Sequence, residues 1–161
     1  MKRIVTVCAL GILSVMGCRK IKNYPEVPHI EVLSLEEIPG TPQVKAILSF
    51  TDGDGDLGLD DADTLPPFDT LSKFYNNLFV EYFDQKNGVW IKDTVFTGGF
   101  RTTKITPAGK IKAIDGEFEV MLFFKQEAVP TPDTIKYSFQ LYDRALNASN
   151  KAESKAIVVN R

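Results

Sequence analysis

Hydrophobic and polar residues alternate along the chain from residue 30 onward, in short runs with a period of two. The runs are Ile30–Leu35, Val44–Phe50, Leu78–Phe83, Val89–Phe96, Phe118–Phe124, Ile135–Tyr142 and Ala156–Val159. Alternation of this kind is typical of β-strands that bury one face, and the pattern contains no convincing helix. The sequence therefore predicts an all-β protein of about seven to nine strands.

Turn residues separate these runs. Pro39–Pro42, with one glycine between its prolines, lies between the first two runs. Asn87-Gly88 closes a hairpin between Phe83 and Trp90, because an Asn-Gly pair suits the two-residue turns that join antiparallel strands. Short strands at this spacing predict an antiparallel β-sandwich, and we expect an immunoglobulin-like one.

Within the runs, every second residue is a candidate for the core. The proposed inward-facing residues are Val44, Ala46, Leu48 and Phe50; Leu78, Val80 and Tyr82; Phe118, Val120, Leu122 and Phe124; and Ile135, Tyr137, Phe139 and Leu141. Other large apolar residues fall on the opposite faces, namely Phe79, Phe83, Met121 and Phe123. We expect the strands that carry them either to be covered on both sides or to border an exposed apolar patch.

An acidic loop follows the second run. If Asp52 is position 1, aspartates occupy positions 1, 3, 5, 9 and 12, which are Asp52, Asp54, Asp56, Asp60 and Asp63. This is the spacing of calcium loops of the EF-hand and thrombospondin type, in which oxygen atoms converge on one ion. Without an ion the carboxylates would repel one another. The loop therefore predicts a structural Ca²⁺ site.

Two features distinguish this loop from an EF-hand. Position 6 is Leu57 instead of glycine, and Asp63 at position 12 is shorter than the usual glutamate. The preceding run, Val44–Phe50, alternates, so the loop is expected to follow a strand and not a helix. The alternative interpretation is a solvated turn, since aspartate and glycine both favour turns.

Asp143 is a further candidate ligand. In an immunoglobulin-like order of strands, the acidic loop would be the B–C connection and residues 143–150 the F–G connection, at the same end of the sandwich. Asp143 would then face the same ion, with Asn147 or Asn150 as weaker candidates. An ordinary Asx turn is the alternative at this position.

The first 28 residues predict secretion and lipid attachment. Residues 1–17 have the basic start and short apolar segment of a signal peptide, and Val15–Cys18 matches a lipobox that would make Cys18 the lipidated first residue. Residues 18–28 are expected to form a tether, and residues 29–161 a single β-sandwich domain. The other cysteine, Cys8, lies in the segment that is removed, so neither a disulfide nor a thiolate metal site is expected.

Charge and composition argue against two classes of function. Seven acids and no basic residue lie between Asp52 and Asp69, and no basic patch with interleaved aromatics occurs, so nucleic acid is not an expected partner. The single histidine, His29, has no nucleophile at a recognisable spacing. Paired acids for glycoside hydrolysis would need one carboxyl kept protonated in an apolar site. We therefore expect that the protein is not an enzyme, and hydrolysis is the least favoured of the functions considered.

Three segments carry a resemblance to a family. The lipobox, Phe50–Leu59 with its FTDGDGDxG motif, and Tyr142–Asn150 resemble small lipoproteins of the Bacteroidota with an immunoglobulin-like sandwich. The resemblance implies an outer-membrane lipoprotein and no catalytic residues. In that phylum acidic residues usually follow the cysteine of surface lipoproteins, whereas Arg19–Lys22 is basic here, which favours a domain that faces the periplasm.

The sequence thus predicts a calcium-stabilised lipoprotein of the cell envelope, anchored in the membrane through Cys18. Its expected role is that of a non-catalytic structural or protein-interaction module, with an envelope protein or a glycan as partner. The alternative is a glycan- or peptide-binding lipoprotein that uses Trp90, Phe68 and Tyr75 as a platform near the calcium loop. Trp90 could equally pack across its hairpin.

Overall fold

The fold is an antiparallel β-sandwich, as the alternation predicts. The computed structural model describes residues 23–105, 107, 110, 112–126 and 132–160. Its elements are β1 (His29–Glu37), β2 (Gln43–Asp52), a short 3₁₀ helix η1 (Lys73–Tyr75), β3 (Leu78–Lys86), β4 (Val89–Phe100), β5 (Ile114–Phe123), β6 (Pro132–Leu141), β7 (Ala152–Glu153) and β8 (Ile157–Asn160). The predicted all-β class and number of strands are confirmed, and the described residues contain no helix capable of crossing a membrane.

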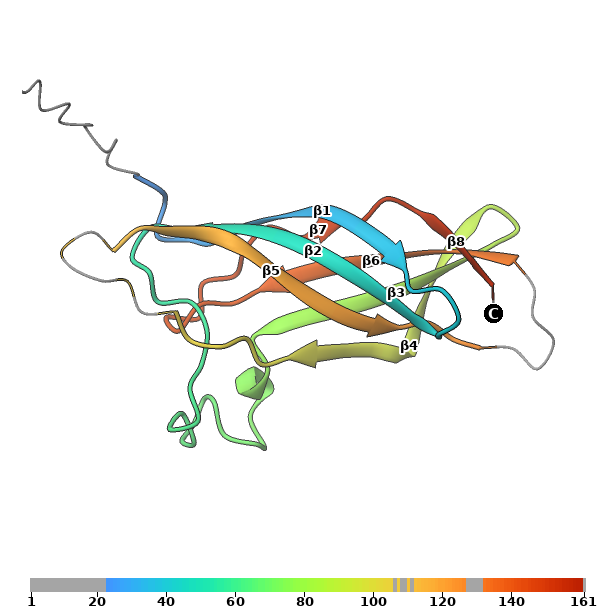
Figure 1. The fold of residues 1–161 in the computed structure, drawn as a ribbon. Helices are drawn as coiled ribbons and strands as arrows, with labels where there is room; N and C mark the ends of the chain where they lie inside the picture. Colours follow the sequence, from blue (N-terminus) through green and yellow to red (C-terminus); the bar gives the residue numbers. More distant parts are fainter. Residues whose placement is uncertain (1–22, 106, 108–109, 111, 127–131, 161) are drawn as a thin grey trace, which may run out of the picture.

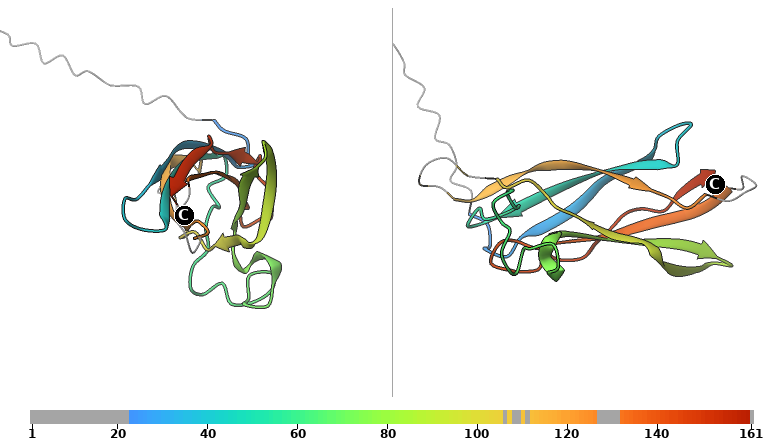
Figure 2. Two further views of the ribbon diagram at one scale, coloured as in Figure 1. Left: turned by 90° about the vertical axis from the view of Figure 1, so that its right-hand side faces the viewer. Right: turned by 90° about the horizontal axis from the view of Figure 1, so that it is seen from below.

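Two sheets form the layers of the sandwich (Figures 1 and 2). The first has the strand order β1-β2-β5, and the second has the order β4-β3-β6-β7, with β8 also paired to β6. Every pair of strands within the sheets is antiparallel. This order does not conflict with an immunoglobulin-like topology, which stays a prediction.

The core lies between the sheets and is built largely of the alternate residues that the sequence singles out, with Ile30, Leu57, Ala152 and Val159 added to them. All of the proposed inward residues are buried except Phe118, which is half-buried and packs against Phe50 at 6.0 Å between ring centroids. On the outer faces, Phe79 and Phe83 are half-buried, whereas Met121 and Phe123 are exposed. The apolar patch expected from the sequence therefore lies on β5.

The two ends of the sandwich carry different features. β3 and β6 run antiparallel with Leu78 opposite Leu141 and Asp84 opposite Ile135. The acidic loop and the residues after β6 therefore lie at one end, and the Asn87-Gly88 hairpin turn lies at the other (Figure 1). The nine residues of β3 span roughly 25 Å between these ends, at about 3.3 Å per residue.

Part of the predicted tether contacts the fold. Signal peptide, Cys18 and the tether up to Lys22 lie outside the described residues. A Cβ atom on Gly53 would lie 2.3 Å from the carbonyl oxygen of Tyr24 and 2.6 Å from that of Pro25, so the chain before β1 crosses the acidic loop closely. Pro28 is buried. The end of the tether is therefore packed against the domain, although the sequence suggests that it lies outside the fold.

Candidate metal centre

Asp52 and Asp143 continue the inward faces of two strands from opposite sheets. Asp52 is the last residue of β2 and follows the inward-facing Phe50 by two positions. Asp143 follows Leu141, the inward-facing last residue of β6, by the same step. Because strand side chains alternate, both carboxylates enter the end of the core, where they are 0% and 1% exposed. Alternation alone thus places two acids in a position normally filled by apolar residues.

The acidic loop returns a third carboxylate to the same point. One carboxylate oxygen from each of Asp52, Asp56 and Asp143 lies within 4.8 Å of the others. The backbone N–H of Ala145 donates to Asp56 Oδ2 at 3.1 Å, and the backbone N–H of Asp56 donates to Asp52 Oδ2 at 3.1 Å. The loop after β2 and the turn after β6 are therefore joined at this group of acids, as the immunoglobulin-like lettering predicts.

Several oxygens of the group lack partners. Oδ1 of Asp52, Asp54 and Asp56 is buried in each case, and none accepts a hydrogen bond within the described part of the chain. A buried carboxylate oxygen without a partner costs considerable free energy, because water no longer solvates it. Such an arrangement is stable only if a cation or a proton supplies the missing interaction.

The pKa values express the same conflict. The pKa of Asp52 is raised from 3.8 to about 6, mainly by burial and next by the charge of Asp54, while backbone N–H groups oppose the shift. Burial also raises the pKa of Asp56, followed by the charges of Asp143 and Asp54. These carboxyls therefore hold protons more tightly than ordinary aspartates do. A bound cation would lower their pKa values again, because it stabilises the charged form.

Glycines and two leucines shape the loop. Gly55 and Gly58 have φ angles of +68° and +82°, and a Cβ atom on either would lie 2.2 Å from a carbonyl oxygen of another segment. Leu57 and Leu59 are buried, and Leu59 forms a parallel bridge with Thr103. Leu57, which departs from the EF-hand pattern, is therefore a core residue that packs the loop against the sandwich.

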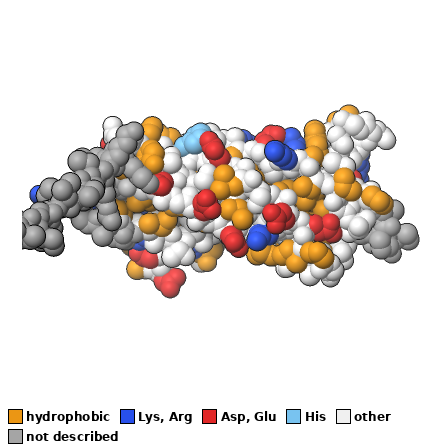
Figure 3. All heavy atoms as spheres, turned by 45° about the horizontal axis from the view of Figure 1, so that its top comes forward, with side chains coloured by type: hydrophobic (Ala, Val, Ile, Leu, Met, Phe, Trp, Pro, Cys, Tyr) orange, Lys and Arg blue, Asp and Glu red, His pale blue; other side chains and the backbone are white. Residues whose placement is uncertain are grey.

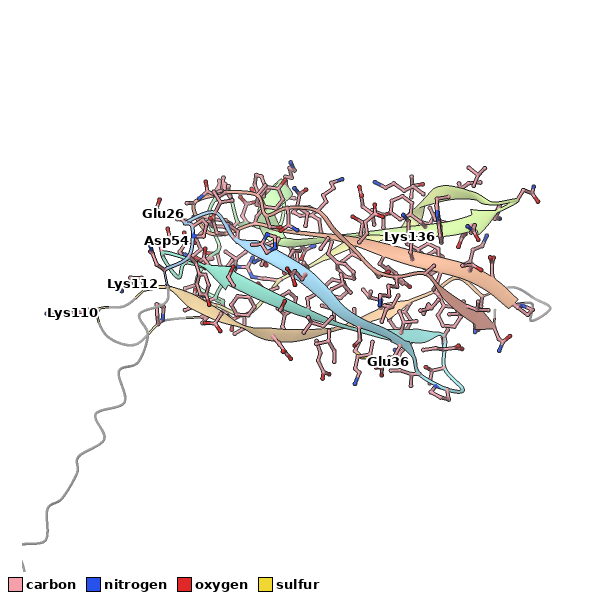
Figure 4. The ribbon with its side chains drawn as sticks, turned by 90° about the horizontal axis from the view of Figure 1, so that it is seen from above. Glu26, Glu36, Asp54, Lys110, Lys112 and Lys136 are labelled. Carbon is pink, nitrogen blue, oxygen red and sulfur yellow. The ribbon has the colours of Figure 1, made fainter. Side chains whose placement is uncertain are left out.

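Asp54 lies beside the group of three. It is half-buried, and its Oδ1 is among the buried oxygens for which the described residues supply no hydrogen-bond donor. Its charge raises the pKa values of both Asp52 and Asp56, which requires that it lie near them. Figure 4 shows Asp54 at the end of the molecule where Glu26 and Lys112 also lie. Asp54 is thus placed to bind the outer side of a cation held by the other three.

The structure gives Asp60 and Asp63 other partners. Lys104 Nζ lies 2.9 Å from Asp60 Oδ2 and lowers the pKa of Asp60. Both carboxylate oxygens of Asp63 bind the guanidinium of Arg144, which holds the pKa of Asp63 far below its usual value. These two aspartates, predicted as ligands from their spacing, instead fasten the second half of the loop to neighbouring segments. The group of three does not include them.

The two asparagines considered as weak ligands also differ. Asn147 donates from its backbone N–H at 2.7 Å and from Nδ2 at 2.8 Å to the carboxylate of Asp143, so it orients that carboxylate. Asn150 pairs with the backbone of Ile30 through both ends of its amide and joins the turn to β1. Asp143 thus makes the expected Asx-type contacts and still lies in the acidic group.

Arg101 is a residue that sequence reasoning missed. Its guanidinium donates to the backbone carbonyl oxygens of Asp60 (2.9 Å), Asp63 (3.0 Å), Phe68 (3.4 Å) and Tyr75 (2.7 Å). One side chain therefore holds the long connection between the acidic loop and β3. No sequence signal marks an isolated arginine for this role, because its partners are carbonyl groups that every residue carries.

The proposed aromatic platform is divided between the two ends of the sandwich. Phe68 and Tyr75 line a pocket of about 370 Å³ next to the acidic loop, with Arg101 stacked 5.1 Å from the Tyr75 ring centroid. Trp90 is opposite Gln85, near the far end of β3, and Lys136 Nζ lies 4.9 Å from its ring centroid. Figure 4 places Lys136 well away from Asp54. The prediction that Trp90 joins Phe68 and Tyr75 is therefore wrong, because strand register carries it to the opposite end.

The group of aspartates fits a hard divalent cation. Its donors are carboxylate oxygens, and two oxygens bound to one Ca²⁺ at about 2.3–2.6 Å lie at most about 5 Å apart, which the observed separations already satisfy. Asp52, Asp56 and Asp143 would hold the ion from inside the fold, and Asp54 from outside.

Comparison of the chain with known protein families, with curated proteins and with solved structures finds no match.

Proposed function

We propose that the protein is a calcium-stabilised lipoprotein of the cell envelope, a non-catalytic module that serves a structural or protein-interaction role. The observation that carries the calcium part is the fully buried Asp52 carboxylate. Its Oδ1 has no hydrogen-bond partner among the described residues, and two further carboxylates lie beside it. A bound Ca²⁺ would supply positive charge to these carboxylates and join the two sheets at one end.

Calcium is preferred to magnesium because of the donor set. Ca²⁺ accepts six to eight oxygen ligands in flexible arrangements, whereas Mg²⁺ requires a small octahedral shell and keeps several waters. Two buried carboxylates, of Asp52 and Asp143, and the half-buried carboxylate of Asp56 offer an oxygen-rich site at the end of the core, built mainly from protein groups. Titration calorimetry with Ca²⁺ tests the assignment: we expect one ion per chain, and loss of binding in Asp143→Asn.

The lipid anchor rests on the signal peptide and lipobox. We expect Cys18→Ser to move the protein from the membrane to the soluble fraction, because the thiol that accepts the lipid is absent. Fractionation followed by immunoblotting measures this. Cys8→Ser is the matched control, since Cys8 lies within the signal peptide, and it should leave the protein in the membrane. Retention of the Cys18→Ser protein would contradict lipidation at this residue.

A second candidate function is glycan binding at the pocket of Phe68 and Tyr75. The observation that favours it is the combination of two aromatic rings with the carboxylates of Asp61 and Asp69 along one pocket. Aromatic faces and acidic hydrogen-bond acceptors are the groups that bind sugar rings and hydroxyls. On a glycan array we expect Tyr75→Ala to lose any binding that the wild type shows. Trp90→Ala should retain it, and equal loss in both variants would exclude this pocket.

A further inference from the structure

One long side of the sandwich is open, and an apolar groove follows it. Two neighbouring cavities of about 580 and 400 Å³ lie between β5 and residues 95–105, and Phe100 lines both. Together they are called the β4–β5 groove. On the other side of the sandwich, β1 contacts β7 and β8. Figure 2 shows the two layers, with β4 and β5 in different layers on the open side.

Large apolar side chains are exposed along this groove. Phe100 and Ile105, which line the groove, are exposed, and Val95 on its β4 side is 83% exposed. Met121 and Phe123 are exposed on the outer face of β5, at the rim of the groove. Phe118, at the base of the groove, is half-buried. A contiguous apolar surface of this kind on a folded protein usually marks an interaction site.

The outer edge of β5 can accept another strand. β5 is the last strand of its sheet, and the backbone N–H of Phe124 donates to the carbonyl oxygen of Pro42 at 3.1 Å, on the side of β2. Because antiparallel pairing alternates, even-numbered residues of β5 direct their backbone groups to β2 and odd-numbered residues direct theirs to the open edge. The row of donors and acceptors at this edge is suited to pairing with an extended segment.

Acidic side chains line the outer face of the same strand. Asp115, Glu117 and Glu119 occupy alternate positions of β5 and are exposed. Neither Glu117 nor Glu119 takes part in an ion pair with another described residue. Figure 3 shows acidic side chains among hydrophobic ones on the face that carries the single histidine. The outer face of β5 therefore presents negative charge at Glu117 and Glu119 beside the apolar Met121 and Phe123, and the groove presents apolar surface.

We propose that the edge of β5 and the β4–β5 groove bind an extended segment of a partner protein in which lysine or arginine alternates with apolar residues. Residues of the partner opposite the odd-numbered residues of β5 lie on the outer face, where basic side chains meet Glu117 and Glu119. The residues between them point into the groove and cover Phe118 and Phe100. Because side chains alternate in β5 and in the partner segment, one extended segment can contact both the acidic outer face and the apolar groove.

Charge also distinguishes this partner from a second copy of the chain. Pairing of two β5 edges would place two acidic rows on one face of a continuous sheet, and like charges close together on a sheet are destabilising. A basic and apolar segment removes this repulsion and contributes attraction. The edge of β5 and the groove would thus be the surface through which the protein fulfils the interaction role of the proposed function. Binding at this surface does not depend on the bound ion.

The test uses the full-length protein in detergent micelles and a fluorescein-labelled nine-residue peptide that alternates lysine and valine. Fluorescence anisotropy should show binding that weakens with added salt, and Glu117→Lys/Glu119→Lys should reduce the affinity at least about tenfold. Glu31→Lys/Glu36→Lys is the matched control, because both residues are exposed on β1 at the opposite edge of the sheet and should leave binding unchanged. Calcium titration of the same samples reports separately on the metal site.

Two further peptides make the test specific. A peptide that alternates glutamate and valine should not bind, and N-methylation of alternate residues of the lysine peptide should abolish binding, because it removes donors for the edge of β5. Equal binding of the acidic peptide, or no effect of the double substitution on β5, would overturn the proposal. A dimer that the β5 substitutions disperse would assign the edge to a second copy. Tighter peptide binding after neutralising Lys20 and Lys22 would assign it to the chain's own tether. Either result excludes the proposed partner.

Discussion

Removal of Ca²⁺ with EGTA should lower the melting temperature of the protein by about 10 °C relative to the protein in excess Ca²⁺. The proposed ion would bind the folded state, in which Asp52, Asp56 and Asp143 lie together, and the unfolded chain does not preserve this arrangement. Free ion at 100 times its dissociation constant stabilises the folded state by about 2.7 kcal/mol. Circular dichroism during heating measures the difference, and Mg²⁺ should restore little of it.

Substitutions in the acidic loop separate this effect from a general loss of charge. Asp52→Asn should abolish the dependence of the melting temperature on Ca²⁺, because it removes a buried ligand. Asp60→Asn is the matched control: it changes the same charge in the same loop, but Lys104 already holds the Asp60 side chain at the surface. The calcium site is wrong if the wild type melts at one temperature in both conditions, or if Asp60→Asn loses the calcium effect as completely as Asp52→Asn.

In EGTA, the stability due to Asp52 should fall as the pH rises from about 4 to 7. The folded-state pKa of this carboxyl is about 6, against an ordinary value of 3.8. The folded state therefore keeps a proton that the unfolded state has lost between these values, and the free energy of unfolding decreases with rising pH. A shift of this size corresponds to about 3 kcal/mol at neutral pH.

The measurement is the difference in unfolding free energy between the wild type and Asp52→Asn across this pH range. The difference isolates Asp52 from carboxylates such as Asp63 and Glu81, whose lowered pKa values favour the folded state and lose that contribution only as the pH falls. Asp52→Asn should become the more stable protein in EGTA as the pH approaches 7. A difference that does not change with pH would show that burial does not perturb this carboxyl.

The alternation of side chains predicted the fold, and in the structure the same property accounts for two of the aspartates, which the sequence analysis reached through loop spacing and immunoglobulin-like lettering. The period of two identified the inward faces, and the extension of two of these faces by one further step reaches Asp52 and Asp143. The glycines between the aspartates gave a correct indication of a tightly folded loop. Local pattern is sufficient in these cases because each residue's direction is set by its own strand.

Spacing was insufficient where a distant residue determines the outcome. Asp60 and Asp63 fit the calcium pattern, yet they form ion pairs with Lys104 and Arg144. Arg144 follows Asp63 by 81 positions in the chain. No spacing rule within a loop includes such a partner. Trp90 illustrates the same limit, because only the strand register reveals that its hairpin turn lies at the far end of the sandwich.

The contact of Tyr24 and Pro25 with Gly53 determines how the domain would stand on a membrane. With a lipid on Cys18, five residues lie between the anchor and Tyr24, and the six Cα–Cα steps of an extended chain reach about 20 Å. The acidic end would then be held within this distance of the bilayer, because the chain packs on the acidic loop at Tyr24 and Pro25. The Asn87-Gly88 turn and Trp90 would lie at the end away from the lipid. The open edge of β5 would extend from the bilayer side toward that end.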